Sequence, residues 1–174
     1  MVLAMRDMLV LTIIGPDRTG LVESVSDCIA THGGNWEESR MAHLAGQFAG
    51  ILLVTIDPAR TDQLLSSLRA LENAGLQVTA QSTAQATPAS GMSVSLQVNG
   101  QDRPGIIRDV SRILAERGIN VEKLESEVKS AAMSGEHMFW ARAHLVAPSD
   151  VDLADLRARL ERLSGELMVD LTVE

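Results

Sequence analysis

Two short segments of the chain combine glycine, aspartate and arginine at the same spacing. They read GPDRTG, residues 15–20, and GQDRPG, residues 100–105, and each lies between a predicted strand and a predicted helix. The free backbone N–H groups of a helix's first turn and the helix dipole together favour an anion. The sequence therefore predicts that each loop can bind an anionic group such as a carboxylate.

We expect the glycines of these loops to have two different roles. Gly15 and Gly100 permit a tight turn at the end of the strand, while Gly20 and Gly105 expose the backbone to close approach by a ligand. An alternative interpretation is purely structural, because any junction from strand to helix needs such a turn. The occurrence of this loop at two places in the chain does not decide between the ligand-binding and the structural interpretation, since a duplicated domain would inherit its turns as well as its binding sites.

The polar residues of the loops allow the same two interpretations. Asp17 and Asp102 are candidates for helix caps, and Pro104 fits a first helical turn because its missing N–H is not needed there. Arg18 and Arg103 are candidates for ligand contacts, with a solvated or interdomain salt bridge as the alternative.

Two asparagines extend the candidate site. Asn35 and Asn120 open the strand that follows each helix, and we expect them close to the loop at the helix start. The alternative is that they only satisfy a turn at the strand entry.

No catalytic constellation emerges from the remaining chemically capable residues. The four histidines are scattered, and none forms a metal-binding spacing with Cys28, which lies on the apolar stripe of a helix. Glu37 and Glu38 are interpreted as exposed strand residues, and GPDRTG lacks the Lys and Ser or Thr that would follow in a phosphate-binding P-loop. The sequence predicts a protein that is not an enzyme, without catalytic residues, metal or cofactor. The histidines are His32, His43, His137 and His144.

The chain repeats itself, which explains why the loop occurs twice. A shift of 85 residues places Gly15 on Gly100 and aligns residues 11–37 with 96–122 without a gap. The second copy is longer, and we expect its extra residues in a loop near 130–135.

Within each copy the hydrophobic period alternates between that of a strand and that of a helix. The pattern predicts a β-α-β-β-α-β unit, the ferredoxin-like arrangement, in which both helices cover one face of an antiparallel sheet. The fold class is thus α+β, with tandem domains at 5–84 and 92–174 and a linker at 85–91. The expected helices are residues 19–32, 60–74, 104–117 and 151–164.

The outward sheet face differs between the copies. Met8 and Val10 are expected on this face in the first copy, where the second has Ser93 and Ser95. An apolar outward face favours a partner surface, within the chain or in a homodimer.

The D-R-x-G turn before an amphipathic helix, followed by Gly and then Asn at the next strand, resembles the ACT domain in both copies. This resemblance covers almost the whole chain, although Thr19 departs from the family's usual proline, which Pro104 keeps. It implies a regulatory module that binds a small ligand, commonly an amino acid, at an interface between paired domains. Glycine is the first ligand that the resemblance suggests. It gives a place in the ligand sites to Gly15, Asp17, Arg18, Gly20 and Asn35, and to Gly100, Asp102, Arg103, Gly105 and Asn120.

Charge and composition restrict the partners. The formal net charge of −8 repels phosphate and disfavours direct DNA binding, and aromatic residues, at 2%, are too few for base stacking. A single cysteine fits a reducing compartment, and the apolar N-terminal stretch is interrupted by Arg6 and Asp7, so we expect a cytoplasmic protein without a membrane span.

Three functional hypotheses remain. The favoured one is an amino-acid-sensing regulator that controls transcription by contacting a transcriptional activator protein. The alternatives are an amino-acid-binding regulatory subunit of a metabolic enzyme, and an enzyme. The last is disfavoured because no segment lies outside the two repeats.

Overall fold

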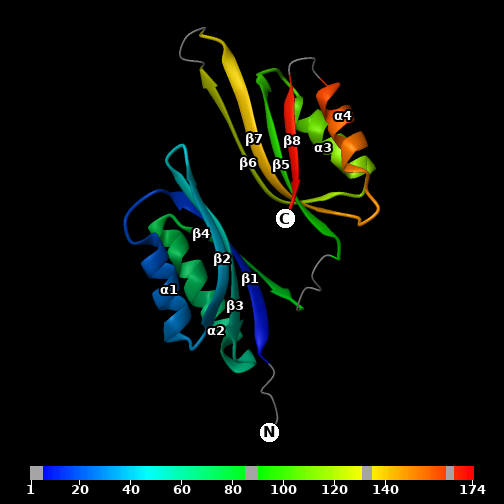
Figure 1. The fold of residues 1–174 in the computed structure, drawn as a ribbon. Coiled ribbons are helices and arrows are strands. Elements are labelled where there is room, and N and C mark those ends of the chain that lie inside the picture. The colour runs from blue at the N-terminus through cyan, green and yellow to red at the C-terminus, as the bar shows by residue number, and fades with distance from the viewer. Residues whose placement is uncertain (1–5, 85–89, 131–134, 164–166) are drawn as a thin grey trace. The chain divides into compact units, whose positions relative to one another are not determined.

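The computed structural model describes residues 6–84, 90–130, 135–163 and 167–174. The chain divides into two compact units, residues 1–87 and 88–174, hereafter unit 1 and unit 2 (Figure 1). The expected linker at 85–91 and the expected extra loop near 130–135 fall largely outside the described residues.

Unit 1 is a β-α-β-β-α-β domain with two short 3-10 helices. Its sheet has the order β2-β3-β1-β4, and the neighbouring strands run antiparallel. The elements in chain order are β1 (Asp7–Pro16), α1 (Leu21–Thr31), β2 (Asn35–Leu44), β3 (Gln47–Ile56), η1 (Pro58–Arg60), α2 (Thr61–Ala70), η2 (Leu71–Ala74) and β4 (Gln77–Thr83).

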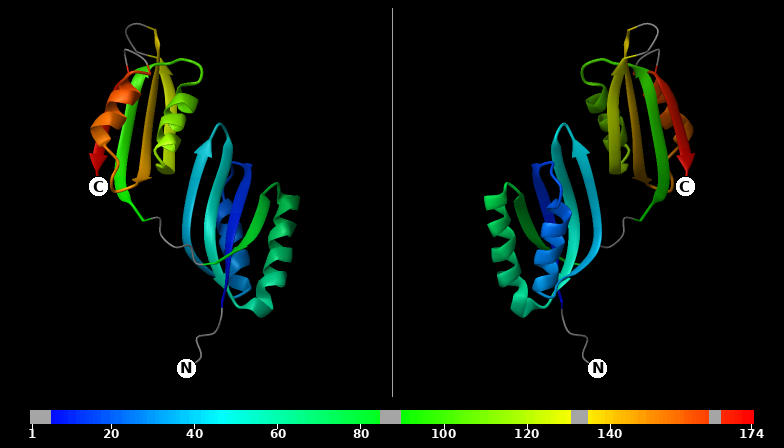
Figure 2. Two further views of the ribbon diagram at one scale, coloured as in Figure 1. Left: turned by 90° about the vertical axis from the view of Figure 1, so that its right-hand side faces the viewer. Right: turned by 90° about the vertical axis from the view of Figure 1, so that its left-hand side faces the viewer.

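Unit 2 repeats this topology, with the sheet order β6-β7-β5-β8. In both units the helices lie on one face of the sheet, so the predicted tandem ferredoxin-like fold is confirmed (Figure 2). The elements are β5 (Met92–Gln101), α3 (Ile106–Glu116), β6 (Asn120–Ser130), β7 (His137–Ala147), α4 (Leu153–Glu161) and β8 (Met168–Val173).

The core of each unit lies between the sheet and its two helices. In unit 1 the alternation along β1 sends Leu9, Leu11 and Ile13 inward, where each is at most 1% exposed. Leu21, Val25 and Ile29 of α1 and Leu64 and Leu68 of α2 complete this core. Unit 2 has its own core, built from the equivalent strands and helices.

The helices differ from the predicted ranges at their ends. The first helix of each unit begins two residues later than expected, because a left-handed glycine, Gly20 or Gly105, occupies the N-cap. The second helix of unit 1 changes to 3-10 geometry at Leu71, and α4 begins at Leu153 after the Asp152 side chain accepts from two backbone N–H groups.

The opposite sheet face, which the helices of the same unit do not cover, differs between the units as predicted. On unit 1 it carries Ile14 and Ile51, 43% and 52% exposed, beside the half-buried Met8 and Val10. On unit 2 the matching strand presents serine and glutamine. Among the described residues, no helix is long and apolar enough to cross a membrane.

Candidate ligand-binding site

The loop of unit 1 joins the end of β1 to the start of α1. Gly20 is the N-cap, with φ 88° and ψ 3°, and its carbonyl accepts the first helical hydrogen bond from the Ser24 N–H at 2.9 Å. Within the described part of the chain, no side chain caps this helix. A positive φ is the conformation that glycine adopts at little cost, and it leaves the backbone of the first turn accessible.

The loop of unit 2 has the same geometry. Gly105 has φ 83° and ψ 7°, and its carbonyl accepts from the Asp109 N–H at 3.0 Å. Again no side chain of the described residues caps the helix. Both predicted loops thus present an uncapped helix start, which is the feature expected to attract an anion.

The predicted helix-cap role of Asp17 and Asp102 is wrong. Because the glycine takes the N-cap, each aspartate stands three residues before it, and its backbone N–H donates to a hairpin carbonyl, Gly46 O at 2.9 Å or His137 O at 2.8 Å. For the same reason Pro104 precedes the N-cap and lies outside the first helical turn. These contacts fasten each loop to the neighbouring hairpin.

The expected tight turn at Gly15 and Gly100 is also wrong, since both glycines lie inside strands β1 and β5. Gly15 is needed for a different reason. A Cβ atom there would lie 2.7 Å from the carbonyl oxygen of Gly75 and 3.3 Å from the Leu76 side chain. The missing side chain lets the end of the strand pack closely against the end of η2.

The two loop arginines fasten the loop to the end of the second helical segment of their unit. The Arg18 Nη2 donates to the Ala74 carbonyl at 2.6 Å, and the Arg103 Nη2 donates to the Leu163 carbonyl at 3.4 Å. The structure therefore gives both side chains a holding role, whether or not they also contact a ligand.

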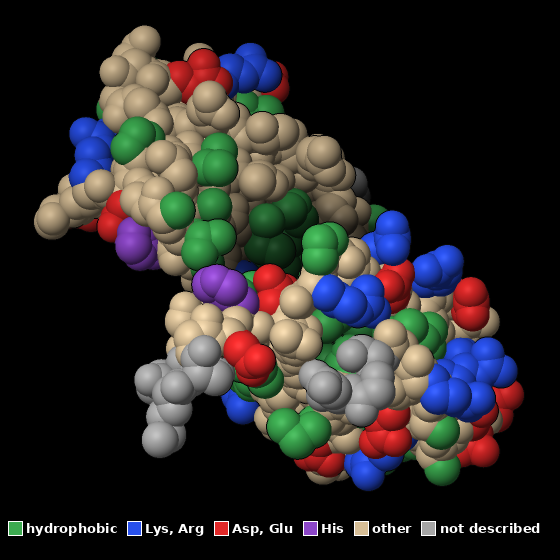
Figure 3. All heavy atoms as spheres, turned by 90° about the horizontal axis from the view of Figure 1, so that it is seen from above, with side chains coloured by type: hydrophobic (Ala, Val, Ile, Leu, Met, Phe, Trp, Pro, Cys, Tyr) green, Lys and Arg blue, Asp and Glu red, His purple; other side chains and the backbone are tan. Residues whose placement is uncertain are grey.

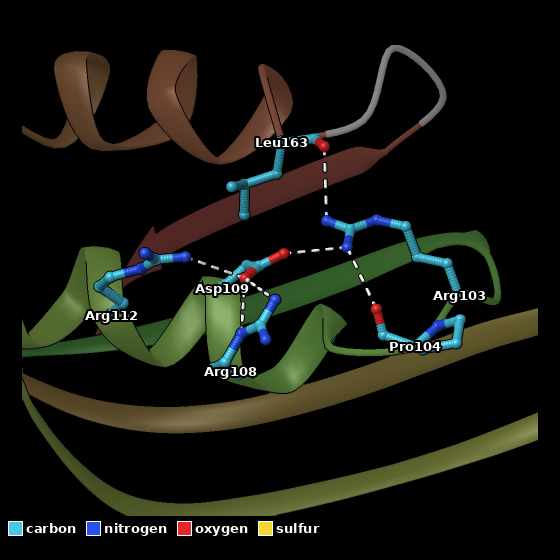
Figure 4. A network of polar contacts seen from close by, with 6 residues as sticks. All are labelled: Arg103, Pro104, Arg108, Asp109, Arg112 and Leu163. Carbon is cyan, nitrogen blue, oxygen red and sulfur yellow. Dashed lines mark hydrogen bonds and ion pairs between the residues drawn. The ribbon is translucent and has the colours of Figure 1, made fainter.

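Asp109 of α3 contacts the arginine of the second loop and was not singled out from the sequence. It is only 8% exposed, and its carboxylate accepts from Arg103 at 2.9 Å, Arg108 at 3.1 Å and Arg112 at 3.0 Å (Figure 4). Hydrogen bonds from Arg103 and then Arg108 hold the pKa of Asp109 below its usual value, against the opposing effect of desolvation.

This cluster distinguishes the two loops electrostatically. In unit 1 the position of Asp109 is taken by Ser24, whose hydroxyl donates to the Gly20 carbonyl at 2.8 Å, and the position of Arg108 is taken by Glu23. Three guanidinium groups around one carboxylate leave a net positive charge beside the start of α3. The sequence could have indicated this cluster, because Asp109 and Arg108 replace Ser24 and Glu23 in two helices that otherwise match.

Asn35 and Asn120 do not lie beside the loops of their own units. Each opens a strand after the helix has run back along the sheet, so about 16 Å of helix separates it from the loop. Asn35 donates to Glu37 at 2.8 Å, and Glu37 also accepts from Thr55 at 2.7 Å. The predicted proximity is therefore wrong within one unit.

An open hollow adjoins the loop of unit 1. Phe48, which pairs with Gly15 across β1 and β3, forms one wall, and the first turn of α1 forms another. The hollow is lined by Asp17, Arg18, Gly20, Leu21, Val22, Glu23 and Phe48.

The histidines and the cysteine have separate surroundings. The His32 Nδ1 donates to the Cys28 carbonyl at 2.8 Å, and its Nε2 lies 3.1 Å from the Ser67 hydroxyl, a contact that the sequence did not predict. His43 Nε2 lies 3.5 Å from the Asp17 carboxylate. Burial raises the pKa of the Cys28 thiol. Among the described residues, no group of histidine, cysteine and carboxylate side chains is arranged to hold a metal.

Comparison with known proteins matches each unit to an ACT-domain model, over residues 7–81 and 94–164. The chain is 27% identical over 170 residues to the glycine cleavage system transcriptional repressor of Escherichia coli K12, covering 96% of this chain and 89% of that protein.

Two solved structures match along nearly the whole chain. One is an unknown protein from Galdieria sulphuraria, with a TM-score of 0.83 and 28% sequence identity. The match covers 98% of this chain and 99% of that protein's chain. The other is a protein proposed to be a glycine cleavage system transcriptional repressor. It has a TM-score of 0.70 and 19% identity with the same coverage, a likeness that shows the fold alone.

Proposed function

Because the chain belongs to the ACT-domain family and carries two such domains in tandem, we propose that it is a regulatory protein that senses an amino acid and controls transcription indirectly. The observation that carries this proposal is the similarity to a transcriptional repressor of the glycine cleavage system along 96% of the chain. Its targets would be glycine cleavage genes, and glycine is the first candidate effector.

The loops supply the proposed sensing chemistry. Each presents an uncapped helix start behind a left-handed glycine, where the carboxylate of an amino acid would accept hydrogen bonds from backbone N–H groups. The guanidinium groups around Asp109 add positive charge at the second loop. A part for Asn35 or Asn120 in the same site requires a second domain that brings its asparagine beside the loop.

Contact with a protein, and not with DNA, is the proposed route to transcription. The net charge of −8 opposes binding to phosphate, and basic and acidic side chains are interspersed on the face drawn in Figure 3. The proposed partner is a transcriptional activator in the cytoplasm, which this protein would inhibit, with amino-acid binding changing the affinity between the two proteins.

The apolar outward face of unit 1 supports a homodimer. Ile14 and Ile51 are 43% and 52% exposed there, beside Met8, Val10 and Leu53. Contiguous apolar surface of this kind is uncommon on monomers and is stabilised when a second copy covers it.

The proposal is tested by affinity capture with the tagged full chain, in the presence and absence of about 1 mM glycine, the upper end of typical KM values, followed by reconstitution with the purified partner. The expected result is capture of a DNA-binding activator whose binding changes with glycine, and loss of the activator's function in a transcription assay when the two proteins are bound. Glycine-dependent binding of a metabolic enzyme whose turnover changes would instead establish the alternative, a regulatory enzyme subunit.

A further inference from the structure

The first helix of each unit carries a pair of like charges on its exposed side. On α1 the pair is Glu23 and Asp27, and on α3 it is Arg108 and Arg112. The shift of 85 residues that aligns the two copies places each arginine on one of the two acidic residues. Residues four apart lie on the same side of a helix, so each pair forms one charged surface. We call these surfaces the acidic face of α1 and the basic face of α3.

Both pairs keep their charge available to a partner. Among the described residues, the carboxylates of Glu23 and Asp27 form no ion pair and no side-chain hydrogen bond. Arg108 and Arg112 share one carboxylate, that of Asp109, with the loop arginine (Figure 4). Their side chains remain 74% and 62% exposed. One negative charge among three guanidinium groups leaves an excess of positive charge on the basic face.

The basic face lies where its own helix disfavours a cation. Arg108 is in the first turn of α3, next to free backbone N–H groups that carry partial positive charge. The same dipole stabilises Glu23 at the matching position of α1. Asp109 offsets part of the cost in α3. Folding of unit 2 alone therefore does not explain the placement of these arginines, whereas a negatively charged counterpart from outside the unit would explain it.

The acidic face of α1 has the pattern that such a counterpart needs. In a pair of packed helices, antiparallel directions place Glu23 opposite Arg112, and parallel directions place it opposite Arg108. Asp27 then meets the other arginine, so the charges are opposite in either direction. Two acidic faces or two basic faces would instead repel each other. The charge pattern thus favours contact between unlike faces and disfavours both contacts between like faces.

We propose that the basic face of α3 binds the acidic face of α1 of a second copy of the chain. This contact goes beyond the proposed function, because it uses neither the two loops nor the apolar outward sheet face of unit 1. Exposed ion pairs are individually weak, so the contact alone does not hold two copies together at low protein concentration. It joins copies that the outward sheet face already pairs, as the protein concentration rises.

Sedimentation velocity of the full chain tests the contact over a range of protein concentrations, at about 0.1 M and about 1 M NaCl. The Debye length is about 10 Å at the lower salt concentration and about 3 Å at the higher one. The parent should show a concentration-dependent association that weakens roughly tenfold or more at the higher salt, because the paired charges are exposed. The homodimer through the apolar sheet face should persist, since that face has little charge to screen.

Two charge-reversal variants identify the faces. Glu23→Arg with Asp27→Arg gives a chain in which both faces are basic, and Arg108→Glu with Arg112→Glu gives a chain in which both are acidic. Each variant alone should associate at least about tenfold more weakly than the parent, because like charges then meet. An equimolar mixture of the two variants should regain the association, because each face of one variant then meets a face of opposite charge on the other.

A control variant separates the effect of the face from that of net charge. Lys123→Glu with Lys129→Glu, on strand β6, changes the net charge as much as the arginine reversal does and should leave the association unchanged. Circular dichroism shows whether each variant is folded. If the glutamate variant of α3 does not fold, Arg108→Gln with Arg112→Gln removes the charge and should weaken the association several-fold.

Three results would overturn the inference: a parent without a salt-sensitive association, folded reversal variants that associate as tightly as the parent, or a mixture that does not regain the association. In the first case the basic face is left for an acidic surface on a different protein. The proposed amino-acid sensing is measured separately and is unaffected by any of these results.

Discussion

Replacing Gly20 by alanine tests whether the first loop depends on a left-handed residue. A Cβ atom at Gly20 would meet only the Glu23 carboxylate, at 3.8 Å, so no steric clash contributes. The cost of φ 88° for an L-residue is about 1–2 kcal/mol. The lower entropy of the unfolded alanine chain offsets about 0.4–1 kcal/mol of it. We therefore expect the free energy of unfolding of unit 1 to fall by about 1 kcal/mol.

The assay must report on unit 1 alone, and the tryptophans allow this. The chain has two, Trp36 packed against the core of unit 1 and Trp140 in unit 2. In a Trp140→Phe background, fluorescence during guanidinium unfolding follows unit 1. A loss of about 1 kcal/mol corresponds to a drop of roughly 4–8 °C in the melting temperature of a domain of this size.

An asparagine variant is the matched control. Asparagine tolerates the left-handed region better than alanine, so Gly20→Asn should lose clearly less stability than Gly20→Ala. If Gly20→Ala unfolds at the same guanidinium concentration as the parent, the helix does not begin from a left-handed residue, and the geometry argued for the loop is refuted.

Three further predictions follow from the surface and the charge cluster. The pKa of Asp109 is lowered in the folded state, so its contribution to stability is present above the unfolded pKa near 4 and is lost as the pH falls below it. Asp109→Asn should therefore flatten the acid dependence of unit 2 unfolding, followed by Trp140 fluorescence; an unchanged slope would contradict this. Ile51→Lys places a charge on the apolar outward face of unit 1 and should convert the dimer to a monomer, as measured by light scattering. A parent protein that is already monomeric would contradict the proposed homodimer. The purified protein should give no gel shift with duplex DNA at physiological salt, whereas nanomolar binding would refute indirect control.

The fold was predictable because the repeat and the hydrophobic periods agree. The alternation that buries Leu9, Leu11 and Ile13 is visible in the sequence, and the second copy confirms each element of the first. The helix starts were predicted two residues early because a left-handed N-cap at Gly20 or Gly105 depends on backbone geometry, which residue types alone do not fix.

The site was predictable only in part. The loops lie where the motif indicated. Asn35, however, is far from the loop of its own unit, because α1 runs back along the sheet and ends at the opposite end of the strands. Asp109 escaped notice because an aspartate on a helix ordinarily faces solvent, and its burial depends on Arg103, six residues away in sequence but in contact in space.

Titration calorimetry with glycine on the full chain tests the central claim most directly, when the parent is compared with a Gly20→Val, Gly105→Val double variant. A β-branched side chain at both N-caps obstructs approach to the backbone N–H groups, whereas Arg18→Ala and Arg103→Ala leave those groups in place. We expect the parent to bind glycine, the arginine variants to bind it more weakly, and the double variant, shown to be folded by circular dichroism, not to bind it. A folded double variant that binds glycine as tightly as the parent would show that the loops are structural turns and that the sensing site lies elsewhere.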